Sequence, residues 1–130
     1  IAVRWQCDVQ TGALLCNRDT LVGALLNLIE NALQAASTHP RLKVHLYGRG
    51  SVLRISISDN GVGIDAVTLA RLGEPFFTTK ATGTGLGLAV VKSVVRAHSG
   101  ALELRSRLGR GTCATLQLPL LPVFAPAISE

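Results

Sequence analysis

Apolar and polar residues alternate along five stretches of the chain, and each stretch predicts a β-strand. The alternation is clearest at 41–47 and 52–59, and the Gly48–Gly50 segment between them predicts a hairpin. It is weaker at 1–9, which we expect to form an edge strand. The last two strands are expected at 101–107 and 111–118, joined by a turn at 108–110.

Two segments place apolar residues at helical spacing instead. The first is expected to begin after a cap at Asn17 or Asp19 and to run to about Ser37. The second is expected to cover 86–98 and to end at a C-terminal stop, Ser99-Gly100.

The order of the elements predicts the fold class. A short helix near 65–72 precedes a long lid at 73–85, so the order is strand, helix, two strands, lid, helix, two strands. This order predicts an α/β (α+β) two-layer sandwich, with a mixed, mostly antiparallel sheet and helices packed on one face. We expect residues 1–119 to form one domain and 120–130 to form a C-terminal tail, because prolines end the periodic pattern.

Composition and charge narrow the class of ligand. The 130 residues are 48% hydrophobic and 16% charged, which is a globular composition. The net charge of +5 is that of either an ordinary basic domain or a domain that binds a polyanion. Aromatic residues, at 4%, are too few to stack the bases of single-stranded nucleic acid. A small phosphate ligand is therefore favoured over nucleic acid.

The cysteines and the lengths of the apolar runs indicate the cellular compartment in which the protein is expected. Cys7, Cys16 and Cys113 include no C-x-x-C pair, so we expect buried thiols in a reducing, cytoplasmic compartment. No apolar run approaches the ~20 residues of a membrane helix, and no signal peptide is recognisable. Because the chain starts at Ile1, we expect it to be a fragment of a longer protein.

One face of the first predicted helix is polar without being cationic. This stripe contains Thr20, Gly23, Asn27, Glu30, Asn31 and Gln34, and the opposite side holds Leu21, Val22, Leu25, Ile29, Ala32, Leu33 and Ala36. Such a face is either solvated or turned toward a ligand. Asn27 and Asn31 lie one turn apart, and an amide oxygen is a ligand suited to Mg²⁺.

Asp59 falls on the apolar face of strand 52–59, where a carboxylate needs hydrogen bonds to offset its desolvation. It is either a turn residue in Asp59-Asn60-Gly61 or an acceptor for an amino group inside a pocket. Gly61 and Gly63 follow at once, and two glycines so close allow a ligand to approach the backbone.

A second glycine run, Gly83–Leu88, opens the second predicted helix. It is either a flexible linker or a phosphate cradle, because free N–H groups and the positive end of the helix dipole meet there. Its spacing fits neither the Rossmann fingerprint nor a P-loop.

Five motifs follow one another along the chain: LNLIENA at 26–32, DNGVGI at 59–64, EPFFTTK at 74–80, GTGLGL at 83–88 and GRGT at 109–112. Together they resemble the N, G1, F and G2 boxes and the final Gly-Thr motif of the ATP-binding catalytic domain of sensor histidine kinases. This domain has the Bergerat fold of the gyrase, Hsp90, histidine kinase and MutL superfamily. The EPFFTTK form is most similar to nitrogen-regulation-type kinases.

The resemblance implies that the domain binds ATP and Mg²⁺ and passes the γ-phosphoryl group to a histidine. Asp59 would accept a hydrogen bond from the adenine amino group, and Asn31 would ligate Mg²⁺. The implied catalytic residues are Asn27, Glu30 and Lys80. The implied nucleotide-binding residues are Asn27, Asn31, Gln34, Asp59, Gly61, Gly63, Ile64, Lys80, Thr84, Gly85, Leu86, Gly87, Leu88 and Thr112. An asparagine at position 27 cannot act as a base on water, which favours transfer over hydrolysis.

The phosphoacceptor is expected outside this chain, because none of His39, His45 and His98 precedes an acidic residue. The implied partners are a dimerisation and phosphoacceptor domain of the same protein and a downstream response regulator, and no nucleic acid. We expect a monomeric fragment, a homodimeric full-length protein, and a cytoplasmic location, alone or as the cytoplasmic part of a membrane-attached kinase. The alternatives are an ATP-binding regulatory module and an anti-sigma-type Ser/Thr kinase.

Overall fold

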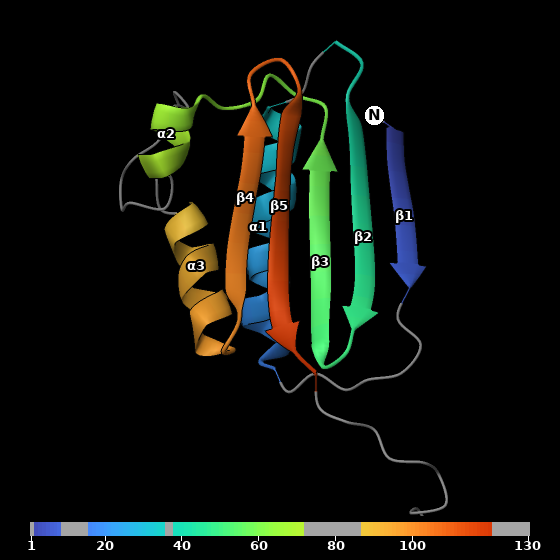
Figure 1. The fold of residues 1–130 in the computed structure, drawn as a ribbon, viewed down its shortest axis with the longest axis vertical. Coiled ribbons are helices and arrows are strands. Elements are labelled where there is room, and N and C mark those ends of the chain that lie inside the picture. Colours follow the sequence, from blue (N-terminus) through green and yellow to red (C-terminus); the bar gives the residue numbers. More distant parts are fainter. Residues whose placement is uncertain (1, 9–15, 36–37, 72–86, 121–130) are drawn as a thin grey trace, which may run out of the picture.

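The computed structural model describes residues 2–8, 16–35, 38–71 and 87–120 (Figure 1). Within them the elements are, in order, β1 (Ala2–Asp8), α1 (Arg18–Gln34), β2 (Arg41–Arg49), β3 (Val52–Asp59), α2 (Ala66–Arg71), α3 (Gly87–Ala97), β4 (Ala101–Arg107) and β5 (Gly111–Pro119). The lid expected at 73–85 lies outside the described residues. Leu120, the first residue of the expected tail, packs against the core and donates its N–H to the Ser51 carbonyl (2.7 Å).

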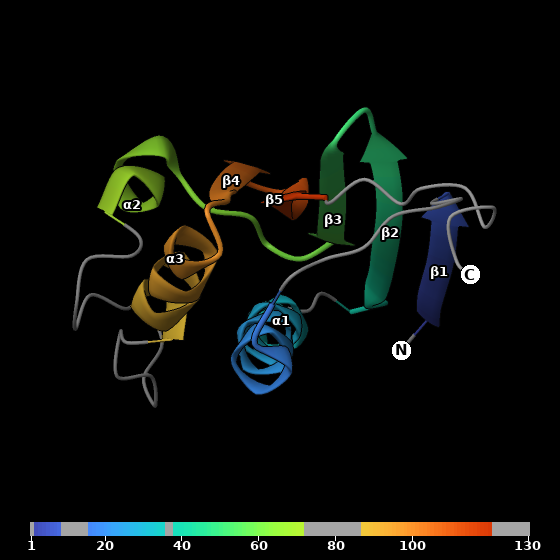
Figure 2. The same cartoon turned by 90° about the horizontal axis from the view of Figure 1, so that it is seen from below.

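The five described strands form one sheet in the order β1-β2-β3-β5-β4. β1 runs parallel to β2 at the edge, as its weak alternation suggested, and all other neighbours are antiparallel. α1 and α3 lie side by side against one face of the sheet, and α2 lies beyond the β4 edge (Figure 2). The predicted two-layer sandwich is therefore confirmed.

The strand boundaries are close to the predicted ones, with one difference in the first hairpin. β3 and β4 begin and end where the alternation predicts. β2 continues through Arg49, so the turn is Gly50-Ser51 rather than Gly48–Gly50. Gly50 has the left-handed φ of 61° that suits a tight hairpin turn and that glycine adopts at little cost.

The hydrophobic core lies between the sheet and the helix pair. The inward residues of β3 and β5 face each other in register, Ile55 with Leu116 and Ile57 with Ala114. The helices complete the core with their buried residues, Leu21, Ala24, Leu28, Ala32, Val91 and Val95. Leu116, on a central strand, is fully buried, so the packing of this side chain joins the sheet to the helices.

α1 begins where the sequence predicts and ends earlier. Asn17 is the N-cap, and its side-chain oxygen accepts a hydrogen bond from the Thr20 N–H (3.2 Å). The helix was expected to reach Ser37, but it ends at Gln34. The carbonyl of the next residue, Ala35, accepts a hydrogen bond from the Val62 N–H (3.1 Å), which directs the chain into a contact with the loop after β3.

α1 is also rotated about its axis relative to the predicted orientation. Val22 and Leu33 were expected on the buried side, but they are 46% and 43% exposed. Ala24 and Leu28 are buried in their place. The reason is that α1 packs against α3 as well as against β3. Its most buried residues therefore point between α3 and the sheet.

The C-terminus of α3 is tied to the N-terminus of α1. The His98 Nε2 accepts a hydrogen bond from the Asn17 N–H (3.0 Å), and its Nδ1 lies 2.8 Å from the Val94 carbonyl oxygen. An accepting Nε2 places the ring hydrogen on Nδ1, which donates to Val94. The predicted stop follows, with Ser99 rather than glycine in the left-handed conformation (φ 58°). The two helices are thus antiparallel and joined at one end.

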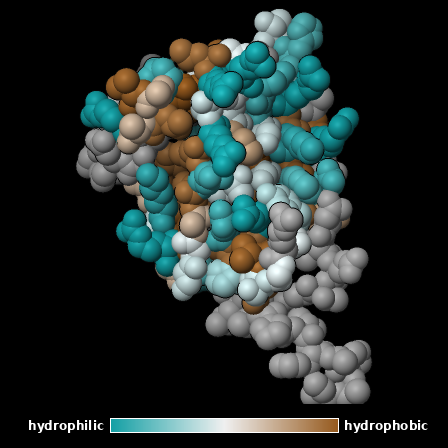
Figure 3. Space-filling model, viewed as in Figure 1, coloured by the Kyte–Doolittle hydropathy of each residue, from teal (hydrophilic) through white to brown (hydrophobic). Residues whose placement is uncertain are grey.

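The opposite face of the sheet carries no helix in the part of the chain that the structure describes (Figure 2). Its centre is small and polar: the hydroxyl oxygens of the cross-strand pair Ser56 and Thr115 lie 3.1 Å apart. Cations surround this centre, and the face is largely hydrophilic (Figure 3). The register places Arg4, Lys43, Arg54 and Arg105 there. These four cations lie on the face opposite Asp59, together with Glu103, which forms an ion pair with Arg105 (3.3 Å).

The cysteines depart from the expectation of buried thiols. Cys7 and Cys16 are exposed, and Cys113 is half-buried, so the expectation is wrong for the first two. Cys7 lies on the edge strand β1, outside the area that α1 covers, and Cys16 precedes the first turn of α1 (Figure 2). No helix among the described residues is long and apolar enough to span a bilayer.

Replacing Leu116 by alanine should lower the free energy of unfolding by about 2–5 kcal/mol, because the fully buried side chain leaves a cavity in a central strand. Chemical denaturation measures this difference. Leu108→Ala is the control: Leu108 is 66% exposed in the β4–β5 turn, and its removal should change the stability by about 0.5 kcal/mol or less. Equal losses in the two variants would contradict this placement of the core.

Candidate nucleotide-binding site

Three of the five predicted motifs, LNLIENA, DNGVGI and GRGT, meet at one end of the sandwich, the upper end in Figure 1. α1 and β3 end there and β5 begins there after the turn from β4, whereas α3 begins lower in the view, beneath α2 (Figure 1). The two helices run antiparallel, so the start of α3 is directed toward the same end. This arrangement brings the N box, the G1 box and the final Gly-Thr motif together.

Asp59 ends β3 on the helix-facing side of the sheet, as its alternation with Ile57 predicts. One carboxylate oxygen, Oδ1, accepts hydrogen bonds from the N–H groups of Gly61 (2.8 Å) and Thr112 (3.3 Å). Within the described part of the chain, Oδ2 receives no hydrogen bond. Burial raises the pKa of Asp59 above its ordinary value of 3.8, and the two N–H groups partly oppose this shift. Asp59 is thus a turn residue, and its Oδ2 is a hydrogen-bond acceptor that no described residue uses.

The loop that follows Asp59 is held by its neighbours. The side chain of Asn60 bridges to the chain before β2: Oδ1 accepts from the Arg41 N–H (2.7 Å), and Nδ2 donates to the His39 carbonyl (2.9 Å). Both polar atoms of the amide are therefore used inside the protein. Asn60 fixes the position from which the loop leaves the sheet.

Gly61 and Gly63 are required by the packing of the chain against itself. A Cβ at Gly61 would overlap the Ala35 carbonyl, and one at Gly63 would overlap the Arg107 carbonyl. Gly63 also has a left-handed φ of 77°. These constraints exist without any ligand, and the approach of a base to these two glycines stays a prediction.

Ser106 belongs to this site, and the sequence analysis missed it. It pairs with Thr112 across β4 and β5 on the helix-facing side. Its hydroxyl oxygen accepts from the Ile64 N–H (2.8 Å) and lies 3.0 Å from the Gly111 carbonyl oxygen and 2.7 Å from Thr112 Oγ1. The signal that identified Asp59 also marks Ser106, because both are polar residues at the end of an otherwise apolar strand face. Thr112 was expected to reach Asp59, and it does so through its N–H, while its hydroxyl contacts Ser106.

The other predicted site residues divide by exposure and by whether the structure describes them. On α1, Asn27 and Asn31 are half-buried, whereas Glu30 and Gln34 are exposed. Gly87 begins α3, and the half-buried Leu88 packs against the core. Four predicted residues, Lys80, Thr84, Gly85 and Leu86, lie outside the described residues.

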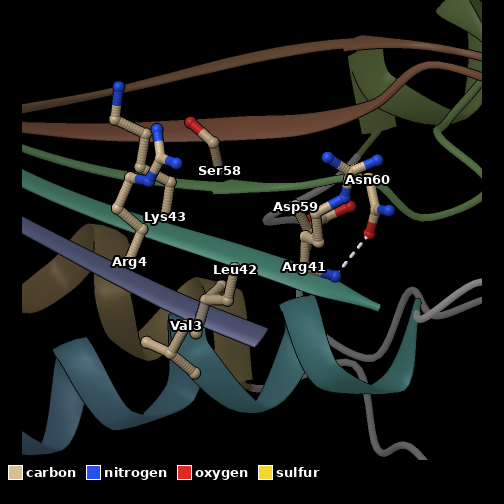
Figure 4. A pocket seen from close by; sticks show the side chains of 8 residues that line it. All are labelled: Val3, Arg4, Arg41, Leu42, Lys43, Ser58, Asp59 and Asn60. Carbon is tan, nitrogen blue, oxygen red and sulfur yellow. Dashed lines mark hydrogen bonds between the residues drawn. The ribbon is translucent and has the colours of Figure 1, made fainter. Parts of the chain in front are cut away.

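An open pocket of about 470 Å³ lies near Asp59, at the β1–β3 side of the sheet. Its lining residues are Val3, Arg4, Arg41, Leu42, Lys43, Ser58, Asp59 and Asn60. Figure 4 shows Arg4, Lys43 and Ser58 on the outer side of the sheet and Val3 and Leu42 directed toward the helix layer. Among the predicted nucleotide-binding residues it includes Asp59 alone, so this pocket overlaps the helix-facing site only at Asp59.

The sequence places the chain among known proteins. Residues 16–122 match the model of a family described as histidine kinase-, DNA gyrase B- and HSP90-like ATPase. The chain belongs to this family. It is 71% identical over 122 residues to the sensor protein kinase FleS of Pseudomonas aeruginosa and 40% identical over 120 residues to the sensor histidine kinase ZraS of Escherichia coli K12. These matches cover 94% and 92% of this chain, which spans 30% and 26% of the lengths of those relatives.

Solved structures agree with the fold. The mycobacterial sensor histidine kinase MprB is similar with a TM-score of 0.80 and 29% identity, covering 93% of this chain and 86% of that chain. Full-length ShkA in complex with AMPPNP has a TM-score of 0.82 and 27% identity, covering 96% of this chain and 27% of that chain. FleS is named as a sensor protein kinase, and ZraS and MprB are named as sensor histidine kinases.

The Asp59→Asn variant should melt at a higher temperature than the wild type at pH 7. The sign follows from the raised pKa: between 3.8 and the folded-state pKa the folded protein binds more protons than the unfolded chain, so the free energy of unfolding falls as the pH rises. The asparagine side chain would keep the oxygen that accepts both N–H bonds and would lose the buried charge. A gain of at most a few degrees is expected at this half-exposed position, where solvent screens the charge.

Melting curves of the two proteins between pH 3 and pH 8 measure this difference. The curves should converge toward the acidic end, where the wild-type carboxyl is itself protonated. A variant that melts lower than the wild type at pH 7 would show that the ionised form is stabilised, contrary to this account of Asp59.

Proposed function

We propose that this domain binds Mg-ATP and donates the γ-phosphoryl group to a histidine on a separate dimerisation and phosphoacceptor domain. Asp59 is the observation that carries the proposal. Its Oδ1 is fixed by two N–H groups, and its Oδ2 is unused among the described residues. An ionised carboxylate only accepts hydrogen bonds, so it matches the amino group of adenine and rejects the carbonyl of guanine.

The relatives support the nucleotide and the reaction. FleS and ZraS are named as kinases, and ShkA was solved with AMPPNP, an adenine nucleotide analogue. Histidine kinases transfer phosphate to protein, which agrees with the residue at position 27. Asn27 cannot take a proton from water, so the site favours transfer over hydrolysis.

The end of α1 has the donors that Mg²⁺ needs. Asn27 and Asn31 are half-buried and lie one turn apart, and their amide oxygens are hard ligands. We assign Asn31 to the metal and Asn27 to the phosphate side. Bound Mg²⁺ would neutralise charge on the transferring phosphate. The N–H groups at the start of α3, from Gly87, would bind the same phosphates.

The remaining roles complete the proposed site. Lys80 neutralises charge near the γ-phosphate, and Glu30, exposed beside Asn27 and Asn31, is the candidate acid/base. Thr112 and Ser106 lie on the adenine side, next to Asp59. The other proposed nucleotide contacts are Gln34, Gly61, Gly63, Ile64, Thr84, Gly85, Leu86 and Leu88.

The proposal extends to the parent protein, of which this chain would be the catalytic part. Residues 1–119, with Leu120 packed against their core, form the catalytic domain, and the residues that follow are its tail. The partners are the dimerisation domain and a response regulator, the full-length protein is a homodimer, and the isolated domain is a monomer. The domain works in the cytoplasm, and the EPFFTTK motif favours the nitrogen-regulation-like subfamily.

Transfer in trans tests the function directly. The domain is mixed with the dimerisation domain of its parent protein and with ATP labelled on the γ-phosphate, and label on that domain is measured. We expect acid-labile label on the acceptor. The Asp59→Asn domain is the matched control, because its ATP affinity should fall roughly ten- to hundredfold while it stays folded. No transfer by a folded, ATP-bound wild type would refute the proposed reaction.

Asn31→Ala should weaken ATP binding in the presence of Mg²⁺ by roughly tenfold or more and should leave metal-free binding nearly unchanged. The reason is that the side-chain oxygen contacts the metal and not the nucleotide. Calorimetry with ATP in excess Mg²⁺ and again in a chelator separates the two affinities. Equal losses under the two conditions would make Asn31 a structural residue.

A further inference from the structure

The hydrogens in the cluster around Ser106 can be assigned. Three contacts meet at its hydroxyl oxygen, from Ile64 N (2.8 Å), the Gly111 carbonyl oxygen (3.0 Å) and Thr112 Oγ1 (2.7 Å). Three hydrogens are available, one on the Ile64 nitrogen and one on each hydroxyl. The Ile64 N–H can only donate, and the Gly111 carbonyl can only accept.

One assignment gives every contact a hydrogen. Ser106 donates to the Gly111 carbonyl and accepts from Ile64, so Thr112 must donate to Ser106. If Ser106 donated to Thr112 instead, the 3.0 Å contact with Gly111 would have no hydrogen. The Thr112 hydroxyl is therefore turned toward β4, and its lone pairs stay unused within the described residues.

We propose that Ser106 is a positioning residue that makes the Thr112 hydroxyl a second acceptor for the adenine amino group, a role that rests on the proposed ATP site. The first acceptor is Oδ2 of Asp59. Thr112 is placed beside it, because its own N–H bonds to Oδ1 of Asp59 (3.3 Å) and both side chains lie on the helix-facing side. An amino group has two hydrogens, so the two acceptors together recognise both of them.

The test compares ATP with purine riboside triphosphate, which lacks only the amino group. Wild type should bind ATP more tightly than this analogue. Ser106→Ala should weaken ATP binding roughly two- to tenfold, the range of one neutral hydrogen bond, and leave the affinity for the analogue unchanged. Ser106→Thr, which keeps a hydroxyl, should restore the preference. Calorimetry gives the affinities, and melting curves show that each variant is folded.

Ser56→Ala is the matched control. It removes the other cross-strand hydroxyl pair of the sheet, Ser56 with Thr115 (3.1 Å), on the outer face away from Asp59. Both nucleotides should keep their affinities in this variant. Thr112→Val, which keeps the shape and loses the hydroxyl, should give the same selective loss as Ser106→Ala, even where the latter is too unstable to measure.

Two results would overturn the inference. One is an equal loss for ATP and the analogue in Ser106→Ala, because Ser106 would then be structural or Thr112 would donate to a ring nitrogen. The other is a further loss of preference when Ser106→Ala is added to Thr112→Val, since Ser106 would then act by another route. A wild type that binds neither nucleotide refutes the proposed function itself, which is a different outcome from either of these.

Discussion

The pair of hydrogen bonds at Oδ1 of Asp59 is the interaction on which the candidate site depends. Through Gly61 this oxygen fixes the loop that leaves β3, and through Thr112 it fixes the first residues of β5. A single oxygen makes both structural contacts, which leaves Oδ2 for a ligand. The second contact also brings Thr112, and with it Ser106, to the same end of the sheet.

This arrangement is rigid at a cost in stability. Burial disfavours the ionised carboxylate and raises the pKa of Asp59, so the ionised side chain lowers the stability of the fold. The neighbouring backbone resists relaxation: the Val62 carbonyl accepts from the Gly109 N–H (2.8 Å), and Gly63 packs on the Arg107 carbonyl. In the proposed function, the amino group of the ligand would donate a hydrogen bond to Oδ2. Because Asp59 is already desolvated in the fold, binding would not have to remove its water.

The sequence predicted the features that follow from the local alternation of residues. It missed the features that depend on contacts between elements distant in the chain. Alternation reports directly which residues face the core, so the ends of β3 and β4 and the place of Asp59 were predicted correctly. A helical wheel cannot report where a second helix packs, and the buried side of α1 was therefore misjudged at Val22 and Leu33. Ser106, like Asp59, is a polar residue at the end of an apolar strand face. An uncharged hydroxyl costs less free energy to bury than a carboxylate, so it is a weaker sign of a functional site.

The glycines of the motifs show that a sequence pattern can identify a family without revealing why each residue is needed. Their pattern led to the correct family, although the reason offered for Gly61 and Gly63 was a ligand, and the structure supplies another in the carbonyls of Ala35 and Arg107. Net charge counts residues without regard to the face on which they lie, so it favoured a phosphate ligand but did not place its site. Motif order was reliable, and the motifs that the structure describes, at 26–32, 59–64 and 109–112, each lie at a defined place in the fold.

The histidine contact at the far end of the helices keeps the His98 side chain out of the proposed chemistry. Both ring nitrogens of His98 are engaged, Nε2 by the Asn17 N–H and Nδ1 by the Val94 carbonyl, so neither is available as a nucleophile while the helices stay joined. His45 lies beside Tyr47 on the outer face, with ring centroids 4.6 Å apart, and the sheet separates it from Asp59. The same contact that removes His98 from the chemistry holds α1 and α3 together at one end. The other end, where α1 stops, is left to form the site.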